Sequence, residues 1–206
     1  MSEPFVHFGK NGEQVQLTIA QGFEVFFDEN VLQDIQAFID SIQELRPEEA
    51  FYFGFWRMSV RQIEGAYRLC EWDFENERFD IQLGRSVCLW HAQRGVVSSQ
   101  GLPWTSVGIN EWLHFTPSVF QDEQDSTVEG VRDTKNVQNG SGWLLYTASD
   151  MQKNLPFESM QLHEALKILD VNILRFLCLP DGWTFNLEAD GQSHIWEEAL
   201  AESPPN

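Results

Sequence analysis

QVQLTIAQGFEVFFDENVLQDIQAFIDSIQEL, residues 14–45, contains the two clearest structural patterns in the chain. Apolar and polar residues alternate over Gln14–Ala20, as they do in a strand with one buried face and one face in water. After Gly22, the segment Phe23–Phe27 predicts a second strand that would form a hairpin with the first. Further on, apolar residues recur at helical spacing, which predicts an amphipathic helix: Val31, Leu32, Ile35, Phe38, Ile39, Ile42 and Leu45.

The ends of this helix also have sequence signals. Asn30 is a suitable N-cap, with Gln33 as its capping-box partner. Pro47 is expected to end the helix, because a residue that precedes proline is disfavoured in the helical region.

Beyond this helix, the sequence predicts more strands than helices. Phe51–Met58 is almost wholly apolar, which is typical of a strand covered on both faces. Gly65–Phe74 and Arg78–Leu83 predict two antiparallel strands joined by a polar turn. For Gly84–Phe120, where Trp residues are scattered among Gly and Pro, we expect loops and one short helix.

The last third begins after a predicted linker at Gln121–Gly130. Here the pattern predicts a strand at Trp143–Thr147, a helix at Ser159–Leu169, a short helix capped by Asp170, and a closing strand at Trp183–Leu187. We therefore predict an α+β protein, mainly antiparallel sheet with a few helices, in two lobes. The predicted N-terminal α+β lobe covers residues 1–127, and the C-terminal α+β domain covers residues 128–206.

Composition restricts the classes of partner. The 206 residues include 32 Asp and Glu but 13 Lys and Arg, which gives a net charge of -19, and 13% of the residues are aromatic. Such an aromatic content indicates a folded chain. The charge argues against binding to nucleic acid or to an anionic membrane, and it favours a basic protein partner. An acidic surface that serves solubility alone fits the same charge.

Residues 1–127 hold 20 acidic and 8 basic residues, and residues 128–206 hold 12 and 5. The charge therefore belongs to both lobes and not to one tail. The N-terminus shows neither a basic region nor an apolar region of a secretory signal, and no apolar run reaches 18 residues. The cysteines Cys70, Cys88 and Cys178 are widely spaced, as is usual in a reducing compartment, so we expect a cytoplasmic protein.

The sequence contains no established catalytic or cofactor motif, so no catalytic residue, metal or cofactor is predicted. The turn Asn139–Gly142 lacks the lysine of a phosphate-binding loop. Asp122, Glu123 and Asp125 lack the order of an EF-hand. One alternative remains, a small metal-dependent hydrolase whose site is assembled from distant residues such as Cys88, His91 and His114.

Residues 141–146, SGWLLY, begin a series of matching segments in the last third. The series continues with Leu162–Leu169, with Asp170-Val171-Asn172-Ile173-Leu174, and with residues 180–185, PDGWTF. Over about residues 131–188 this pattern resembles a bacterial immunity protein of polymorphic toxin systems, the class called immunity protein thirty-three.

The resemblance implies a protein that binds and neutralises a cognate antibacterial toxin by occluding its active site, without catalytic residues of its own. Together with the charge, it suggests a basic toxin that acts in the cytoplasm, such as a nuclease. An adaptor or chaperone that shields a basic effector is a second alternative. The oligomeric state stays open. The predicted partner-binding residues are acids of the first helix and of the strand region that follows residue 70: Asp34, Asp40, Glu44, Glu71, Asp73 and Glu75.

Overall fold

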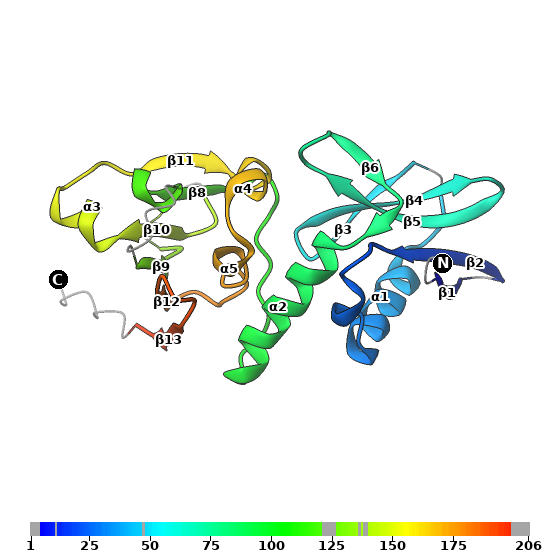
Figure 1. Ribbon diagram of the computed structural model, residues 1–206, viewed down its shortest axis with the longest axis horizontal. Helices are drawn as coiled ribbons and strands as arrows, with labels where there is room; N and C mark the ends of the chain where they lie inside the picture. Colours follow the sequence, from blue (N-terminus) through cyan, green and yellow to red (C-terminus); the bar gives the residue numbers. More distant parts are fainter. Residues whose placement is uncertain are drawn as a thin grey trace. The chain divides into compact units, whose positions relative to one another are not determined.

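A computed structural model describes residues 5–10, 12–46, 48–120, 127–135, 137 and 140–198. The chain divides into two compact units, residues 1–94 and 95–206, called here the first unit and the second unit. Each unit has its own mostly antiparallel sheet, and helices accompany both sheets, so the predicted α+β class is confirmed (Figure 1). No helix in the described part of the chain combines the length and apolar character needed to cross a membrane.

The division between the units lies earlier than the one expected at residues 127 and 128. The reason is β8, Trp112–Phe115, which pairs with strands that follow residue 127 and so belongs to the second sheet. Most of the linker predicted at Gln121–Gly130 lies outside the described residues. Its last three residues, from Val128, form the start of strand β9.

The sheet of the first unit has the strand order β1-β2-β5-β4-β3. Two short strands extend it, β6 on β5 and β7 on β2, and the pairs β2/β5 and β2/β7 are parallel. The strands are β1 Phe5–Lys10, β2 Glu13–Ile19, β3 Ala50–Phe53, β4 Trp56–Ile63, β5 Ala66–Asp73, β6 Arg78–Asp80 and β7 Gln82–Leu83. The strand predicted at Gln14–Ala20 is confirmed as β2, but its hairpin partner is β1. The strand predicted at Phe23–Phe27 is wrong, since a 3-10 helix, η1 Glu24–Phe26, occupies that segment.

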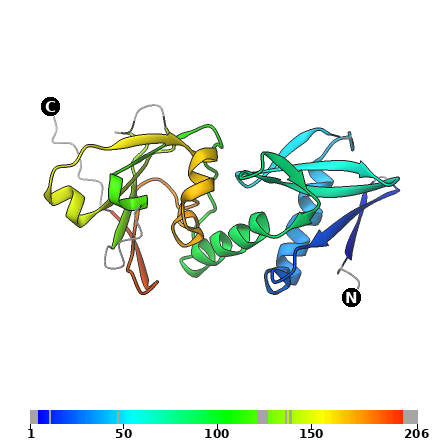
Figure 2. The ribbon, with the colours of Figure 1, turned by 45° about the horizontal axis from the view of Figure 1, so that its top comes forward.

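Helix α1, Glu29–Ser41, is the predicted amphipathic helix. Its N-cap is Asp28 and not Asn30, because the Asp28 carboxylate accepts a hydrogen bond from the Val31 amide at 2.8 Å. The helix ends at Ser41, earlier than expected, and Pro47 lies outside the described residues. Its apolar side rests on one face of the sheet, where the Phe38 ring meets the β3 rings of Phe51 and Phe53 (Figure 2).

The apolar run Phe51–Met58 is not one strand but most of the hairpin β3–β4. Gly54 has a φ of 62°, a conformation that favours glycine, and it reverses the chain inside the run. Phe53, Trp56 and Met58 are buried, so both arms of the hairpin need apolar side chains. The run of apolar residues therefore continues through the turn from β3 into β4.

Helix α2, Arg85–Ser99, occupies 15 residues of the stretch Gly84–Phe120, where only loops and one short helix were predicted. Its polar residues are spread around the helix, so it has no amphipathic stripe to reveal it. Its N-terminus is capped by the Glu71 carboxylate of β5, which accepts from the amides of Arg85 at 3.2 Å and Ser86 at 3.0 Å, and from the Ser86 hydroxyl. A carboxylate suits this position because it satisfies unpaired amides and the positive end of the helix dipole.

The sheet of the second unit has the order β11-β8-β10-β9-β12-β13, and in it β8 and β10 are parallel. Its strands, besides β8, are β9 Val128–Arg132, β10 Trp143–Thr147, β11 Glu158–Gln161, β12 Trp183–Leu187 and β13 Ser193–Glu197. The strands predicted at Trp143–Thr147 and Trp183–Leu187 are thus confirmed. The remaining elements are η2 Pro117–Phe120, α3 Ala148–Gln152, α4 Leu162–Ile168 and α5 Val171–Leu174.

The helix predicted at Ser159–Leu169 begins later than expected, because its first residues form strand β11. The predicted cap of the next helix is confirmed. The Asp170 carboxylate accepts a hydrogen bond from the Asn172 amide at 2.6 Å at the start of α5.

The residues Ser141, Gly142 and Trp143 connect several parts of the second unit. The Ser141 hydroxyl donates to the Trp112 carbonyl at 2.9 Å, and the fully buried Trp143 donates from its indole nitrogen to the Leu177 carbonyl at 3.2 Å. Arg132, which is also buried, donates to the carbonyls of Ser141 at 3.2 Å and Leu179 at 2.6 Å. This segment therefore links β8, β9, β10 and the chain that follows α5.

Replacing Gly142 with Ala should destabilise the protein more than an ordinary turn glycine would. Gly142 has a φ of 81°, and a Cβ there would lie 2.7 Å from Cγ2 of Thr134. We expect the free energy of unfolding, measured in urea, to fall by about 2–4 kcal/mol. Gly191→Ala is the matched control, because Gly191 has a φ of 84° but no atom within 4 Å of the added Cβ. Equal losses in the two variants would contradict the close approach to Thr134.

Replacing Glu71 with Ala should weaken the attachment of α2 to β5. The amides of Arg85 and Ser86 lose their acceptor, so we expect the free energy of unfolding to fall by about 2–4 kcal/mol. Hydrogen exchange at these two amides should accelerate. Glu13→Ala, at an exposed position of β2, should change stability by less than about 0.5 kcal/mol. Unchanged exchange in the Glu71 variant would show that another group caps the helix.

Candidate partner-binding surface

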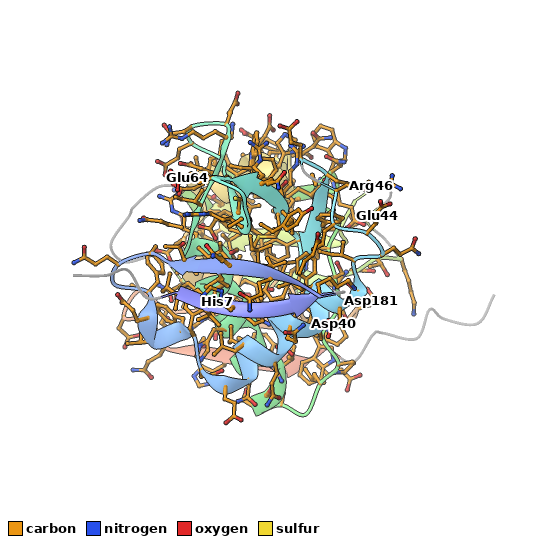
Figure 3. The ribbon with its side chains drawn as sticks, turned by 90° about the vertical axis from the view of Figure 1, so that its right-hand side faces the viewer. His7, Asp40, Glu44, Arg46, Glu64 and Asp181 are labelled. Carbon is orange, nitrogen blue, oxygen red and sulfur yellow. The ribbon has the colours of Figure 1, made fainter. Side chains whose placement is uncertain are left out.

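Two of the predicted contact acids lie exposed near the C-terminal end of α1. The Asp40 carboxylate accepts a hydrogen bond from the Gln36 side chain at 2.9 Å. Glu44 forms an exposed ion pair with Arg46 at 2.7 Å. Such exposed pairs contribute little to stability, so both carboxylates remain open to a partner. Figure 3 shows Asp40, Glu44 and Arg46 in the right half of the view and Glu64 in the upper left.

A groove of about 740 Å³ lies beside Glu44, between the end of α1 and strand β3. Its walls combine carboxylates with aromatic rings: the lining residues are Phe38, Ser41, Ile42, Gln43, Glu44, Arg46, Glu49, Phe51 and Tyr52. Tyr52 is 51% exposed, and β3 forms one end of the strand order in its sheet. Carboxylates next to rings suit a lysine or arginine side chain, through charge-assisted hydrogen bonds and cation–π contact.

The carboxylate of Asp34, a third predicted contact residue, already binds side chains of the first unit. It accepts a hydrogen bond from the Trp90 indole at 2.9 Å and forms an ion pair with Arg94. Trp90 in turn packs on Phe53 of β3, with ring centroids 4.6 Å apart. Asp34 thus joins α1 to α2.

Glu71, another predicted contact residue, does not lie on a solvent-exposed face of its strand. Its side chain is buried, with 7% of the residue exposed, and its carboxylate caps α2. Burial raises the pKa of Glu71, while the hydrogen bonds from Ser86 oppose that rise. The sequence did not indicate this burial, because the helix that Glu71 caps begins 14 positions later in the chain.

Asp73 and Glu75 lie together where β5 leads into β6. The Asp73 carboxylate accepts from the Asn76 side chain at 2.6 Å and from the Glu75 amide at 2.9 Å. The side-chain hydrogen bond from Asn76 lowers the pKa of Asp73. Glu75 is exposed and pairs with Arg85 at 2.9 Å. The lowered pKa favours the charged form of Asp73, and the contact of either residue with a partner stays a prediction.

The residues of the alternative hydrolase do not form a metal site in the part of the chain that the structure describes, where no group of three or more potential ligands comes together. Burial raises the pKa of the Cys88 thiol, which disfavours the reactive thiolate. His91 lies 3.5 Å from the Asp28 carboxylate, and His114 shares a hydrogen bond with the Ser159 hydroxyl at 2.7 Å. Asp122, Glu123, Asp125 and Asn139 lie outside the described residues.

Sequence reasoning missed the groove, because residues 51–58 were interpreted as one strand buried on both faces. This interpretation did not predict that Tyr52 is exposed or that Phe51 lines the groove. A glycine inside the apolar run, Gly54, was the signal that a hairpin, and hence a strand at the end of the sheet, begins there.

The comparisons with known proteins agree with the earlier resemblance. A family model described as an Imm33-like domain matches residues 92–198, slightly more than half of the 206 residues. The match includes the whole Ser141–Trp143 segment and extends back into α2, well before the expected domain start at residue 128. Comparison with the curated proteins and with the solved structures gave no match. The chain therefore belongs to the Imm33-like family of immunity-protein domains.

Proposed function

We propose that this protein is a cytoplasmic immunity protein that binds a cognate antibacterial toxin and neutralises it by covering the toxin's active site. The family match is the observation that carries the proposal. The net charge of -19 supports a basic toxin, such as a nuclease with a cationic substrate groove. Neutralisation of this kind needs a complementary surface and no catalytic residue.

The groove beside α1 is our proposed contact region. Glu44 and Glu49 supply negative charge, and Tyr52 supplies an exposed ring of the type enriched at interface hot spots. Asp40 adds charge close to the same helix end. A lysine or arginine side chain of the toxin would fit between these groups.

Asp73 and Glu75 form a second proposed contact of the same charge. Asp34 is left out of the contact because its carboxylate already binds Trp90 and Arg94, and Glu71 is left out because it is buried.

Co-expression with the toxin encoded beside this gene is the direct test of the function. Cells that make the toxin should survive when they also make this protein, and the two proteins should elute together from a sizing column. Continued killing without a complex would overturn the proposal. A stable complex in which the purified toxin stays active would indicate an adaptor or chaperone instead.

Reversing two charges beside the groove should weaken toxin binding. For Asp40→Lys combined with Glu44→Lys we expect a loss in affinity of about 100-fold, measured by calorimetry. The matched control is Glu13→Lys combined with Glu197→Lys, both exposed and equal in total charge change. If the two double variants lose the same affinity, only the overall charge matters and the groove is not the contact.

The association rate should depend strongly on salt. Between about 50 and 500 mM salt we expect the rate to fall by about 10-fold or more, because the Debye length shortens from beyond 10 Å to a few Å. Stopped-flow mixing with the toxin measures this rate, and the dissociation rate should change less. A flat association rate would show that the acidic surface does not steer the encounter.

A further inference from the structure

The sheet face of the first unit that points away from α1 carries a row of arginines. Arg57 and Arg61 lie two alternations apart on β4, so their side chains leave the same face. Arg68 of β5 is the register partner of Arg61. We call Arg57, Arg61 and Arg68 the arginine row. It stands out in a unit whose overall surface is acidic.

Aromatic rings hold two of these guanidinium groups. The Arg57 Cζ lies 4.7 Å from the ring centroid of Trp72, and the Arg61 Cζ lies 4.6 Å from that of Phe79. Trp72 and Phe79 also contact each other, with centroids 4.9 Å apart. Stacking occupies the flat face of a guanidinium and leaves its N–H edge free to donate. The arginines are thus oriented in advance for an acceptor.

The arginine row lacks the carboxylates that pair arginines elsewhere in this unit. Arg46, Arg85 and Arg94 each have a carboxylate partner within 3 Å. In the arginine row, Arg68 reaches the exposed Glu64 at 3.6 Å, and neither Arg57 nor Arg61 has an ion pair among the described residues. Arg61 and Arg68 also face each other as like charges, which is unfavourable in a sheet. An acceptor between them would remove this repulsion.

Buried polar atoms at the row also lack partners. Within the described residues, Nε of Arg61, Nε of Arg68 and the hydroxyl of Ser59 have no hydrogen-bond partner. Ser59 is fully buried, and it lies between Arg57 and Arg61 on the same side of β4. Leaving such groups unpaired is costly, which is a reason to expect a ligand here.

The surroundings strengthen any interaction with an anion. Burial raises the pKa of the adjacent Cys70 thiol to about 11, although Arg61 and Arg68 both act to lower it. The Asp80 carboxylate acts with burial to raise this pKa, and burial has the largest influence because Cys70 is fully shielded from water. Ion pairs are stronger in such a place than at an exposed surface.

We infer that the arginine row binds carboxylate side chains on an extended acidic segment of a protein partner. Arg57 and Arg61 are four positions apart along the strand, about 13 Å, which is too far for one carboxylate or one phosphate. Acids four residues apart on an extended chain have the same spacing. A nucleic acid is disfavoured, because the net charge of -19 repels a polyphosphate. The inference rests on the proposed function in one respect, that the partner is a protein.

The test uses the full-length protein and a synthetic peptide, so it does not depend on the toxin. The probe is a nine-residue peptide, Glu-Gly-Ser-Gly-Glu-Gly-Ser-Gly-Glu, and its control has Gln in place of each Glu. Binding is followed by the side-chain Nε–Hε signals of the arginines in NMR spectra. We expect the Glu peptide to shift the signals of Arg57, Arg61 and Arg68 saturably, and the Gln peptide to leave them unchanged. Equal shifts with both peptides, or none with either, would overturn the inference.

Two further arms separate other causes. Inorganic phosphate at matched ionic strength should give small shifts without saturation. If phosphate instead saturates the arginine signals at lower concentrations than the peptide does, the site binds phosphate.

Arg61→Gln should weaken peptide binding about 10-fold or more. Arg78→Gln is the matched control, since Arg78 is exposed on β6 outside the row. Arg57→Gln replaces Arg61→Gln if the latter does not fold, and an unchanged affinity would overturn the inference. If the protein binds the peptide as expected but does not neutralise the toxin, the result would contradict the proposed function and leave the inference about the arginine row standing.

Discussion

Two carboxylates hold helix α2 to the rest of the first unit, and the arrangement of that unit depends on them. Glu71 binds the amides at the start of the helix, and Asp34 binds Trp90 and Arg94 further along it. Because α2 has no amphipathic stripe, apolar packing alone does not specify its position as it does for α1. These two acids therefore stabilise the fold, and the surface charge available to a partner lies in other residues.

The sequence predicted the elements that are specified by their own periodicity and caps. Alternation located β2, β10 and β12, helical spacing located α1, and Asp170 located α5. The sequence failed where a distant partner decides the structure. Helix α2 is capped from β5, and β8 and β11 are strands because they pair with each other. The partner-binding prediction divides in the same way: the exposure of Asp40 follows from the polar face of α1, whereas the burial of Glu71 depends on α2.

The segment that carried the family resemblance has a structural role in this chain. Gly142 permits the close approach to Thr134, and Ser141 and Trp143 use their polar groups on carbonyls within the second unit. Trp143 is fully buried, so it offers no surface to a partner. The motif therefore identifies the fold of the matched domain without indicating its contacts. This explains why the family was recognisable from the sequence while the contact residues were not.

Two surfaces of opposite sign in the first unit have different consequences for specificity. An acidic surface attracts any basic protein, so charge alone raises the rate of encounter without selecting one toxin. The arginine row adds a local requirement, because a basic protein without a matching acidic segment would leave the guanidinium groups of Arg57 and Arg61 without an ion pair and partly desolvated. That penalty applies to every partner except one with acids at the correct spacing. Attraction by the net charge and rejection by the arginine row together would let a strongly acidic protein discriminate among basic partners.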